Sequence, residues 1–166
     1  MLSRQEFQGL FASDWSSAWR WECQGTYHEP QEQEPLRRFL AGEADDHAWF
    51  AWPKRVRAWV STGRKIGRVR MLTDPLTDYL RFELSITPPA LDAGEDIRFL
   101  HHARAAELGA PDKDFWMFDD NTVVLMTFDD HGVSGAELIT DATSVRPYAD
   151  WQDVATREAV PFASLT

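Results

Sequence analysis

A basic run between residues 54 and 70 contains the side chains best suited to bind an anion. It carries seven Lys and Arg residues and no Asp or Glu, in a chain whose formal net charge is -10. Arg68 and Arg70 alternate with Val69 and Met71, so the two arginines are predicted to share one face of a strand. Arginine binds carboxylates and phosphates through paired hydrogen bonds, so this face could hold an anionic ligand.

Polar residues from other segments could complete a charged pocket on that face. Arg20 lies on the polar face of an earlier predicted strand. In an enzyme, arginines would fix the substrate while a carboxylate or a tyrosine moved a proton. The alternative is that the basic run pairs with acids at the surface, where each pair adds little stability. The candidate ligand-binding residues are Arg68, Arg70, Tyr79, Arg81, Glu95 and Arg98, with Glu83 nearby and Asp119 as a more distant acid.

Tryptophans accompany the helix that Pro53 is predicted to begin. Trp and Arg are frequent anchors of protein interfaces. Large aromatic residues also fill cores, so both roles stay open at this point. The candidate partner-binding residues are Trp49, Trp52, Arg55 and Trp59.

The remaining motifs give no catalytic or metal-binding signature. The sequence has no GxSxG, no glycine-rich phosphate loop, no HExxH and no CxxC. Its single cysteine, Cys23, follows Trp19 and Trp21 on one strand face and is predicted to be a buried small residue. Adjacent histidines at 101 and 102 diverge in direction and rarely bind one metal. No metal and no cofactor are therefore predicted, and the sequence does not decide whether a reaction is catalysed.

Two acidic clusters border the strands predicted after residue 114. The stretch DFWMFDD spans Asp114 to Asp120, and Asp129, Asp130 and His131 follow. Asp favours tight turns because its side chain satisfies nearby backbone groups. Successive turns of a meander lie at opposite ends of strands roughly 23 Å long. These acids are therefore predicted to shape turns rather than to share one metal ion.

Helices and strands alternate irregularly along the chain. Ser3 is predicted to cap a first helix, and Asp45 with Asp46 to open a helical region. The stretch 80–86 alternates like a strand, but the preceding Asp74-Pro75 favours a helix from about residue 76. The pattern predicts an α+β fold in a single domain, residues 1–166. We expect a mixed or antiparallel sheet of about five or six strands, with a C-terminal three-strand meander, packed by helices.

The negative net charge argues against direct binding to nucleic acid. The N-terminus lacks the basic and apolar regions of a secretory signal. The longest apolar runs are only a few residues, too short to cross a membrane. We therefore expect a cytoplasmic protein without membrane contact, and we predict no oligomeric state.

Four long stretches resemble a family of small proteins of unknown function from actinobacteria. The resemblance covers most of the chain. It implies genes that lie beside helix-turn-helix regulators and small acidic partner proteins, in a toxin–antitoxin-like context, and it implies no established catalytic residue. The stretches are PLRRFLAGEADD (35–46), RVRMLTDPLTDYLRFEL (68–84), AGEDIRFL (93–100) and DFWMFDDNTVVLMTFDDHGVSGAEL (114–138).

Two functions of different classes follow from these observations. The first is a regulatory protein that binds a protein partner, such as a helix-turn-helix regulator, through an aromatic and charged surface. An acidic protein complements the basic surface of a DNA-binding partner. The alternative is an enzyme or small-ligand binder, with a pocket lined by Arg, Glu and Tyr for an anionic ligand.

Overall fold

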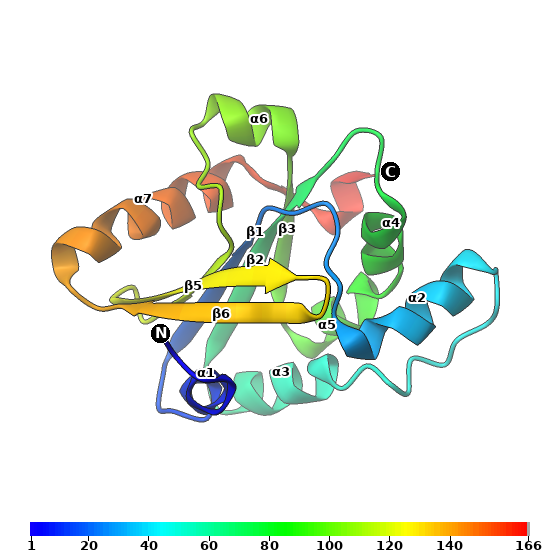
Figure 1. The fold of residues 1–166 in the computed structure, drawn as a ribbon, viewed down its shortest axis with the longest axis horizontal. Coiled ribbons are helices and arrows are strands. Elements are labelled where there is room, and N and C mark those ends of the chain that lie inside the picture. The colour runs from blue at the N-terminus through cyan, green and yellow to red at the C-terminus, as the bar shows by residue number, and fades with distance from the viewer. Residues whose placement is uncertain (166) are drawn as a thin grey trace.

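A mixed β-sheet of seven strands runs through the centre of the protein (Figure 1). The computed structural model describes residues 1–165. The strands are β1 (Ser17–Glu22), β2 (Lys65–Leu72), β3 (Asp96–His101), β4 (Phe115–Phe118), β5 (Thr122–Asp129), β6 (Gly132–Ile139) and β7 (Val160–Pro161).

The sheet has a parallel half and an antiparallel half. Its order is β6-β5-β4-β1-β2-β3-β7, in which β1, β2 and β3 are parallel and β4, β5 and β6 form a meander. The predicted α+β class and meander are confirmed. The sheet exceeds the predicted size because β7 adds a two-residue edge strand beside β3, too short to leave an alternating pattern in the sequence.

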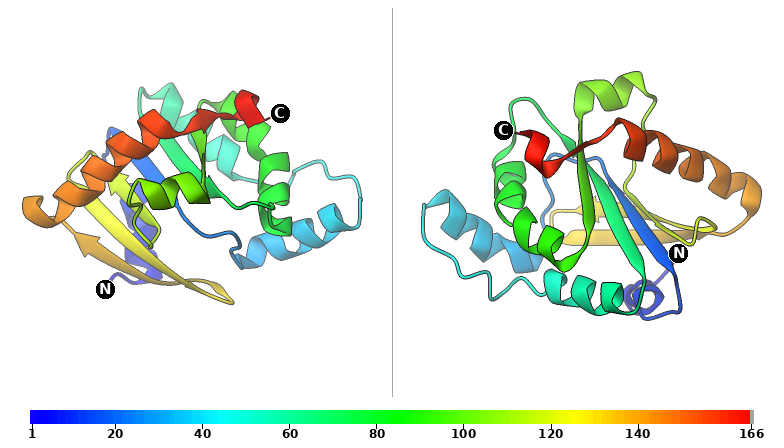
Figure 2. Two further views of the ribbon diagram at one scale, coloured as in Figure 1. Left: turned by 90° about the horizontal axis from the view of Figure 1, so that it is seen from above. Right: turned by 180° about the vertical axis from the view of Figure 1, so that it is seen from behind.

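Helices cover both faces of the sheet (Figure 2). The first helix, the helix directly before β2 and the two helices before β3 cover one face, and the last two α-helices cover the other. The helix formed by residues 33–40 stands beside the sheet and packs against the first helix after β2 (Figure 1). The helices are α1 (Arg4–Phe11), η1 (Pro30–Glu32), α2 (Gln33–Leu40), α3 (Trp52–Ser61), α4 (Asp78–Ser85), α5 (Thr87–Ala93), α6 (His102–Glu107), α7 (Ala142–Glu158) and η2 (Phe162–Leu165).

Alternation along β1 divides its side chains between the two faces. Trp19 and Trp21 point into the core under α7, where Trp21 packs edge-on against Trp151 with ring centroids 5.0 Å apart. Arg20 and Glu22 point to the opposite face. The strand therefore places charged side chains in the layer beneath α1 and α3, where an apolar core would be expected.

Local signals account for most helix starts. Ser3 and Glu6 form a capping box at α1, and Thr77 accepts a hydrogen bond from the Leu80 N–H at α4. The helix preferred over a strand for this part of the chain is confirmed. The helical region predicted to open at Asp45 and Asp46 is wrong, because these side chains accept hydrogen bonds from backbone N–H groups two residues later and form turns. The separate helix predicted to begin at Pro53 is confirmed, since α3 begins at Trp52.

Of the acids around β4 and β5, those after each strand shape turns, as predicted. Asp119 and Asp120 adopt left-handed φ angles of 51° and 56° in the β4–β5 turn. The Asp119 carboxylate accepts hydrogen bonds from the N–H groups of Ser16 and Ser17. Asp129 accepts one from the His131 N–H in the next turn. Asp114 differs, because its buried carboxylate bonds to residues far away in the sequence.

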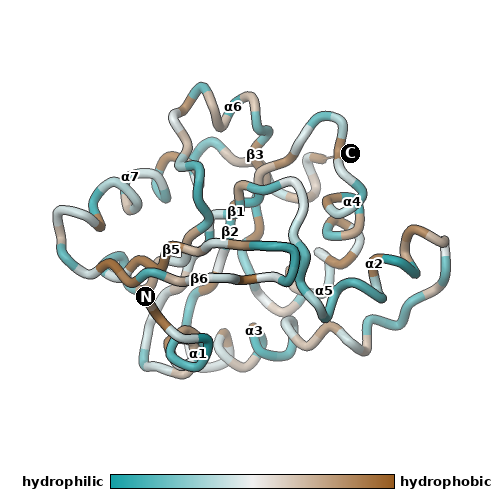
Figure 3. The backbone as a smooth tube through the Cα atoms, in the orientation of Figure 1, coloured by the Kyte–Doolittle hydropathy of each residue, from teal (hydrophilic) through white to brown (hydrophobic). Residues whose placement is uncertain are grey.

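The β5–β6 hairpin lies across the parallel strands. Its polarity changes along its length, from hydrophobic near α7 to hydrophilic at its tip (Figure 3). The base of the hairpin belongs to the core, and β6 residues 133–136 line a cavity between the hairpin and the sheet. Among residues 1–165, no helix is long and apolar enough to cross a membrane.

Candidate functional site

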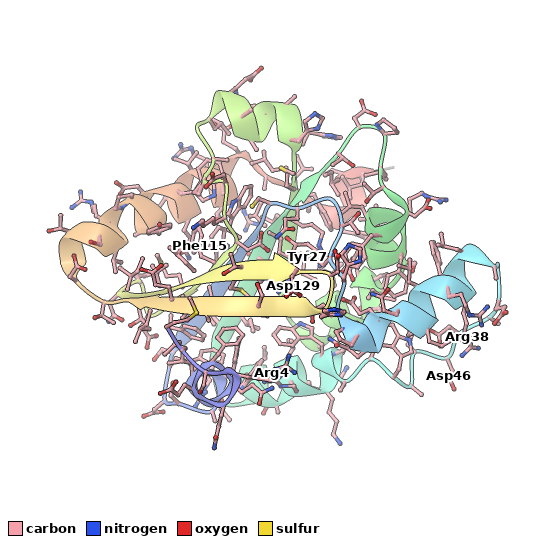
Figure 4. The ribbon with its side chains drawn as sticks, viewed as in Figure 1. Arg4, Tyr27, Arg38, Asp46, Phe115 and Asp129 are labelled. Atoms are coloured by element: carbon pink, nitrogen blue, oxygen red, sulfur yellow. The ribbon has the colours of Figure 1, made fainter. Side chains whose placement is uncertain are left out.

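A pocket with a volume of about 750 Å³ opens on the sheet face that carries Arg20 and Glu22. Strands β1 and β2 form its floor, and α1, α3, α4, β6 and the loop after β1 form its walls. Figure 4 shows Tyr27 of this loop behind the β5–β6 hairpin, and Arg4 on the side of α1 that faces α3. Segments from the whole length of the chain up to β6 therefore contribute to one cavity.

The floor is a network of buried ion pairs. The register of β1 and β2 places Glu22 beside Arg70. Arg68 donates hydrogen bonds to Glu22 and to Glu95, which precedes β3. The Arg70 Nε lies 3.1 Å from Glu22, and its Nη2 lies 2.9 Å from Glu83 on α4. All five residues are at most 8 % exposed, so the network holds strands and helix in fixed relative positions.

The charge of Glu22 depends on this network. Burial favours the neutral acid, but Arg70, Arg20 and Arg68 outweigh it and hold the pKa of Glu22 well below its usual range. Glu22 is therefore ionised at neutral pH and keeps the guanidinium groups in place.

Asp114 ties the loop after β1 to β4. Its carboxylate is buried and accepts hydrogen bonds from the Tyr27 hydroxyl at 2.5 Å, from the Cys23 N–H and thiol at 3.1 Å, and from Arg20 at 3.2 Å. Burial and this carboxylate raise the pKa of the Cys23 thiol. Cys23 thus stays protonated as a hydrogen-bond donor. It is half-buried at the edge of the core, not fully buried as predicted.

Two carboxyl groups meet on the α4 side of the pocket. The Tyr79 hydroxyl donates to Glu32 Oε1 at 2.9 Å, and the Glu83 carboxylate lies beside the Glu32 carboxyl. Burial and then Glu83 raise the pKa of Glu32 to about 10. Glu32 is therefore a neutral acid at pH 7. Glu83 Oε1 is buried and receives no hydrogen bond from any conventional donor among residues 1–165.

The neutral Glu32 makes stability pH-dependent. Its stabilising contribution is complete below its usual pKa of 4.5 and is lost as the pH rises toward about 10. In urea denaturation, Glu32→Gln should therefore match the wild type at pH 5 and be more stable by about 1 kcal/mol or more at pH 9. Glu34→Gln, at an exposed acid of the same helical segment, is the control, and its stability relative to the wild type should not increase between pH 5 and pH 9. Equal pH profiles for wild type and Glu32→Gln would contradict the assignment.

The wall opposite Glu32 combines aromatic rings with an unpaired cation. The Arg55 guanidinium lies over the rings of Phe11, Trp52 and Trp59, at 5.0–5.6 Å from their centroids. Burial lowers the pKa of Arg55. Within residues 1–165, neither Arg55 nor Arg4 forms an ion pair with a carboxylate. Both line the pocket, so it carries two guanidinium groups without a direct ion pair among residues 1–165. Burial raises the pKa of the Glu29 carboxyl in the same pocket, and the charges of Arg20 and Arg4 partly offset this rise.

A family model covers nearly the whole of this architecture. The model of the domain of unknown function DUF6879 matches residues 5–165, from α1 to η2. The chain belongs to the DUF6879 family. No curated protein matches the chain.

The DUF6879 pocket brings together four of the six predicted ligand-binding residues. Arg68, Arg70 and Tyr79 line it, and Glu95 supports Arg68 from below. Arg81 and Arg98 are placed elsewhere.

Arg81 and Arg98 point away for geometric reasons. Arg81 follows Tyr79 by two positions, which places it on the outer side of α4, where it pairs with Asp78. Arg98 aligns with Val69 in the β2–β3 register, so it lies on the sheet face opposite Arg68, where it pairs with Asp96.

The predicted partner-binding residues lie at the same pocket. Trp49, Trp52 and Arg55 line it, while Trp59 packs against the core beneath. The indole N–H of Trp52 donates to Glu95 at 2.7 Å, which links the aromatic wall to the floor. All three tryptophans are half-buried, so they serve the core and a surface at once.

Sequence reasoning missed the acids and tyrosine that the loop after β1 contributes. Tyr27, Glu29 and Glu32 lie in the polar stretch GTYHEPQEQEP, whose two prolines and charges are typical of an exposed loop. Glu22 and Glu83 carried a usable signal, because Glu22 shares a strand face with Arg20 and Glu83 follows Tyr79 by four positions on a helix. The loop acids carried none.

Proposed function

We propose that this DUF6879 protein binds a small organic molecule with an anionic group, a carboxylate or a phosphate, in the pocket beneath the β5–β6 hairpin. The single observation that supports this most strongly is the combination of a rigid ionic floor with two guanidinium groups, Arg4 and Arg55, that form no direct ion pair within residues 1–165. A pocket of about 750 Å³ has the size of a site for a drug-sized ligand.

The aromatic wall suits the body of such a ligand. Trp49, Phe50, Trp52 and Tyr27 line the cavity and offer flat apolar surfaces. The Arg55 guanidinium, at the same wall, offers hydrogen bonds to an anion. Arg55 lies in the first turn of α3, which has no side-chain cap, so the positive end of the helix dipole adds to the same field.

Removal of the Arg55 charge tests this proposal. Wild type, Arg55→Met and the control Arg57→Met would be titrated by calorimetry with indole-3-acetate, phenylacetate and phenyl phosphate. Arg57 lies on the same helix outside the pocket, so its replacement changes the net charge equally. At least one probe should bind the wild type. Its affinity for Arg55→Met should be about tenfold lower, and its affinity for Arg57→Met should equal that for the wild type. No binding by any probe, or equal losses in both variants, would contradict the proposal.

The regulatory function expected from the sequence stays a prediction. It requires a partner protein, such as a helix-turn-helix regulator, to contact Trp49, Trp52, Arg55 and Trp59. The resemblance to an actinobacterial family with that gene neighbourhood is its support. The two proposals share the surface around α3, so a partner bound there would compete with the ligand.

A further inference from the structure

The buried charges around the pocket do not balance. Three guanidinium groups, those of Arg20, Arg68 and Arg70, face four buried carboxylates. With Glu32 counted as a neutral acid, one negative charge still lacks a counterion. A buried charge without a partner is costly, so the cluster is one cation short. The carboxylates are those of Glu22, Glu83, Glu95 and Asp114.

The missing cation has a defined place. Glu83 is 6 % exposed; its Oε2 accepts from Arg70 at 2.9 Å, and its Oε1 is the buried atom without a conventional donor. Glu83 is one of the residues that line the pocket, and its Oε1 lies just beneath the pocket surface. In the other carboxylates, most oxygens are taken by arginine, tryptophan, tyrosine or the Cys23 N–H.

The surroundings of Glu83 fit an organic cation. Glu32 adds a second carboxyl group, and the Tyr79 hydroxyl bonds to it at 2.9 Å. The rings of Tyr79 and Tyr27 lie 5.7 Å apart on the same side of the pocket, and Trp49 lines the pocket nearby. Aromatic faces and carboxylates together are the groups that bind ammonium and guanidinium ions.

We propose that the ligand of this pocket also carries an ammonium or guanidinium group, which binds Glu83 Oε1 beside Glu32. This inference rests on the proposed ligand-binding function and makes the ligand zwitterionic, with its anionic group toward Arg55 and its cationic group toward α4. Glu32 keeps its proton when the ligand binds, so the ammonium or guanidinium group itself supplies the positive charge that the buried cluster lacks.

Matched probes separate the two proposals. Tryptamine and phenethylamine would be titrated by calorimetry beside indole-3-acetate and phenylacetate, which share their ring systems. We expect at least one amine to bind the wild type, and its affinity for Glu83→Gln to be lower by tenfold or more. The control is Glu107→Gln, at an exposed acid on α6 outside the pocket. Its affinity for the amine should stay within about twofold of that of the wild type. If the carboxylate probes bind and neither amine does, this inference is wrong and the proposed function still stands. Failure of every probe would remove both.

Proton exchange gives a second readout that does not depend on a variant. Titrations of the wild type at pH 7 in buffers of different ionisation enthalpy should show no net release of protons on amine binding, because Glu32 stays neutral. The affinity for the amine should accordingly be the same at pH 6 and pH 8. Release of a proton for each amine bound would show that the cation only replaces the Glu32 proton, and would refute the inference that the cluster lacks a cation.

Discussion

Replacement of Arg68 by methionine is expected to lower the free energy of unfolding by about 3–5 kcal/mol. The variant keeps most of the apolar volume of the side chain but leaves Glu22 and Glu95 facing one another with fewer counterions. The loss arises because both carboxylates stay buried in the folded state and regain water only on unfolding. Urea denaturation at pH 7, followed by tryptophan fluorescence, measures it.

The matched control is Arg81→Met. Arg81 was grouped with Arg68 by sequence, but within residues 1–165 it forms one ion pair, with exposed Asp78. That pair is worth no more than about 1 kcal/mol, so the control should stay close to the wild type. If Arg68→Met is as stable as Arg81→Met, the floor of the pocket is not the buried network described above.

Asp114→Ala should produce a loss of similar size, about 3–5 kcal/mol, for a different reason. It removes the acceptor of the Tyr27 hydroxyl, the Cys23 N–H and an Arg20 N–H at one stroke. The loop that carries Tyr27 and Glu32 should then separate from β4. We expect the variant to lose binding of the carboxylate and amine probes as well as stability, at temperatures where it remains folded.

Asp112→Ala distinguishes this anchor from a general effect of charge. Asp112 is exposed and two residues from Asp114, so its loss should change stability by about 0.5 kcal/mol or less. Limited proteolysis adds a structural readout, since cleavage within residues 24–32 should accelerate in Asp114→Ala alone. Unaltered cleavage of this segment would show that Asp114 does not hold the loop.

Asp114 and Asp119 illustrate what the sequence could and could not predict. Both flank the same four-residue strand, and turn chemistry explained both equally well. Asp119 does cap a turn, but Asp114 belongs to the buried network through Arg20 and Tyr27, which lie 94 and 87 residues away in the sequence. The local sequence pattern around Asp114 does not indicate such distant partners, so its role in anchoring the loop could not be predicted.

Sequence periodicity predicted side-chain positions correctly where they depend on a single helix or strand. Alternation along β2 placed Arg68 and Arg70 on one face, and helical spacing placed Tyr79 with Glu83 on one side of α4. It failed for Arg98, because the face that a strand presents depends on its register with β2. It also failed for Asp45 and Asp46, whose side chains capped turns in a loop.

The division of the pocket into floor and wall has a consequence for how this family diversifies. Each floor residue bonds to partners from another strand or helix, so a change at Arg70 requires compensating changes at Glu22 and Glu83 in the same lineage. Changes at wall residues such as Phe50 and Ala51 require no such compensating changes. The floor residues should therefore vary together across relatives, while the wall residues vary independently of one another. Under the proposed function, these wall differences would determine which molecule each relative binds.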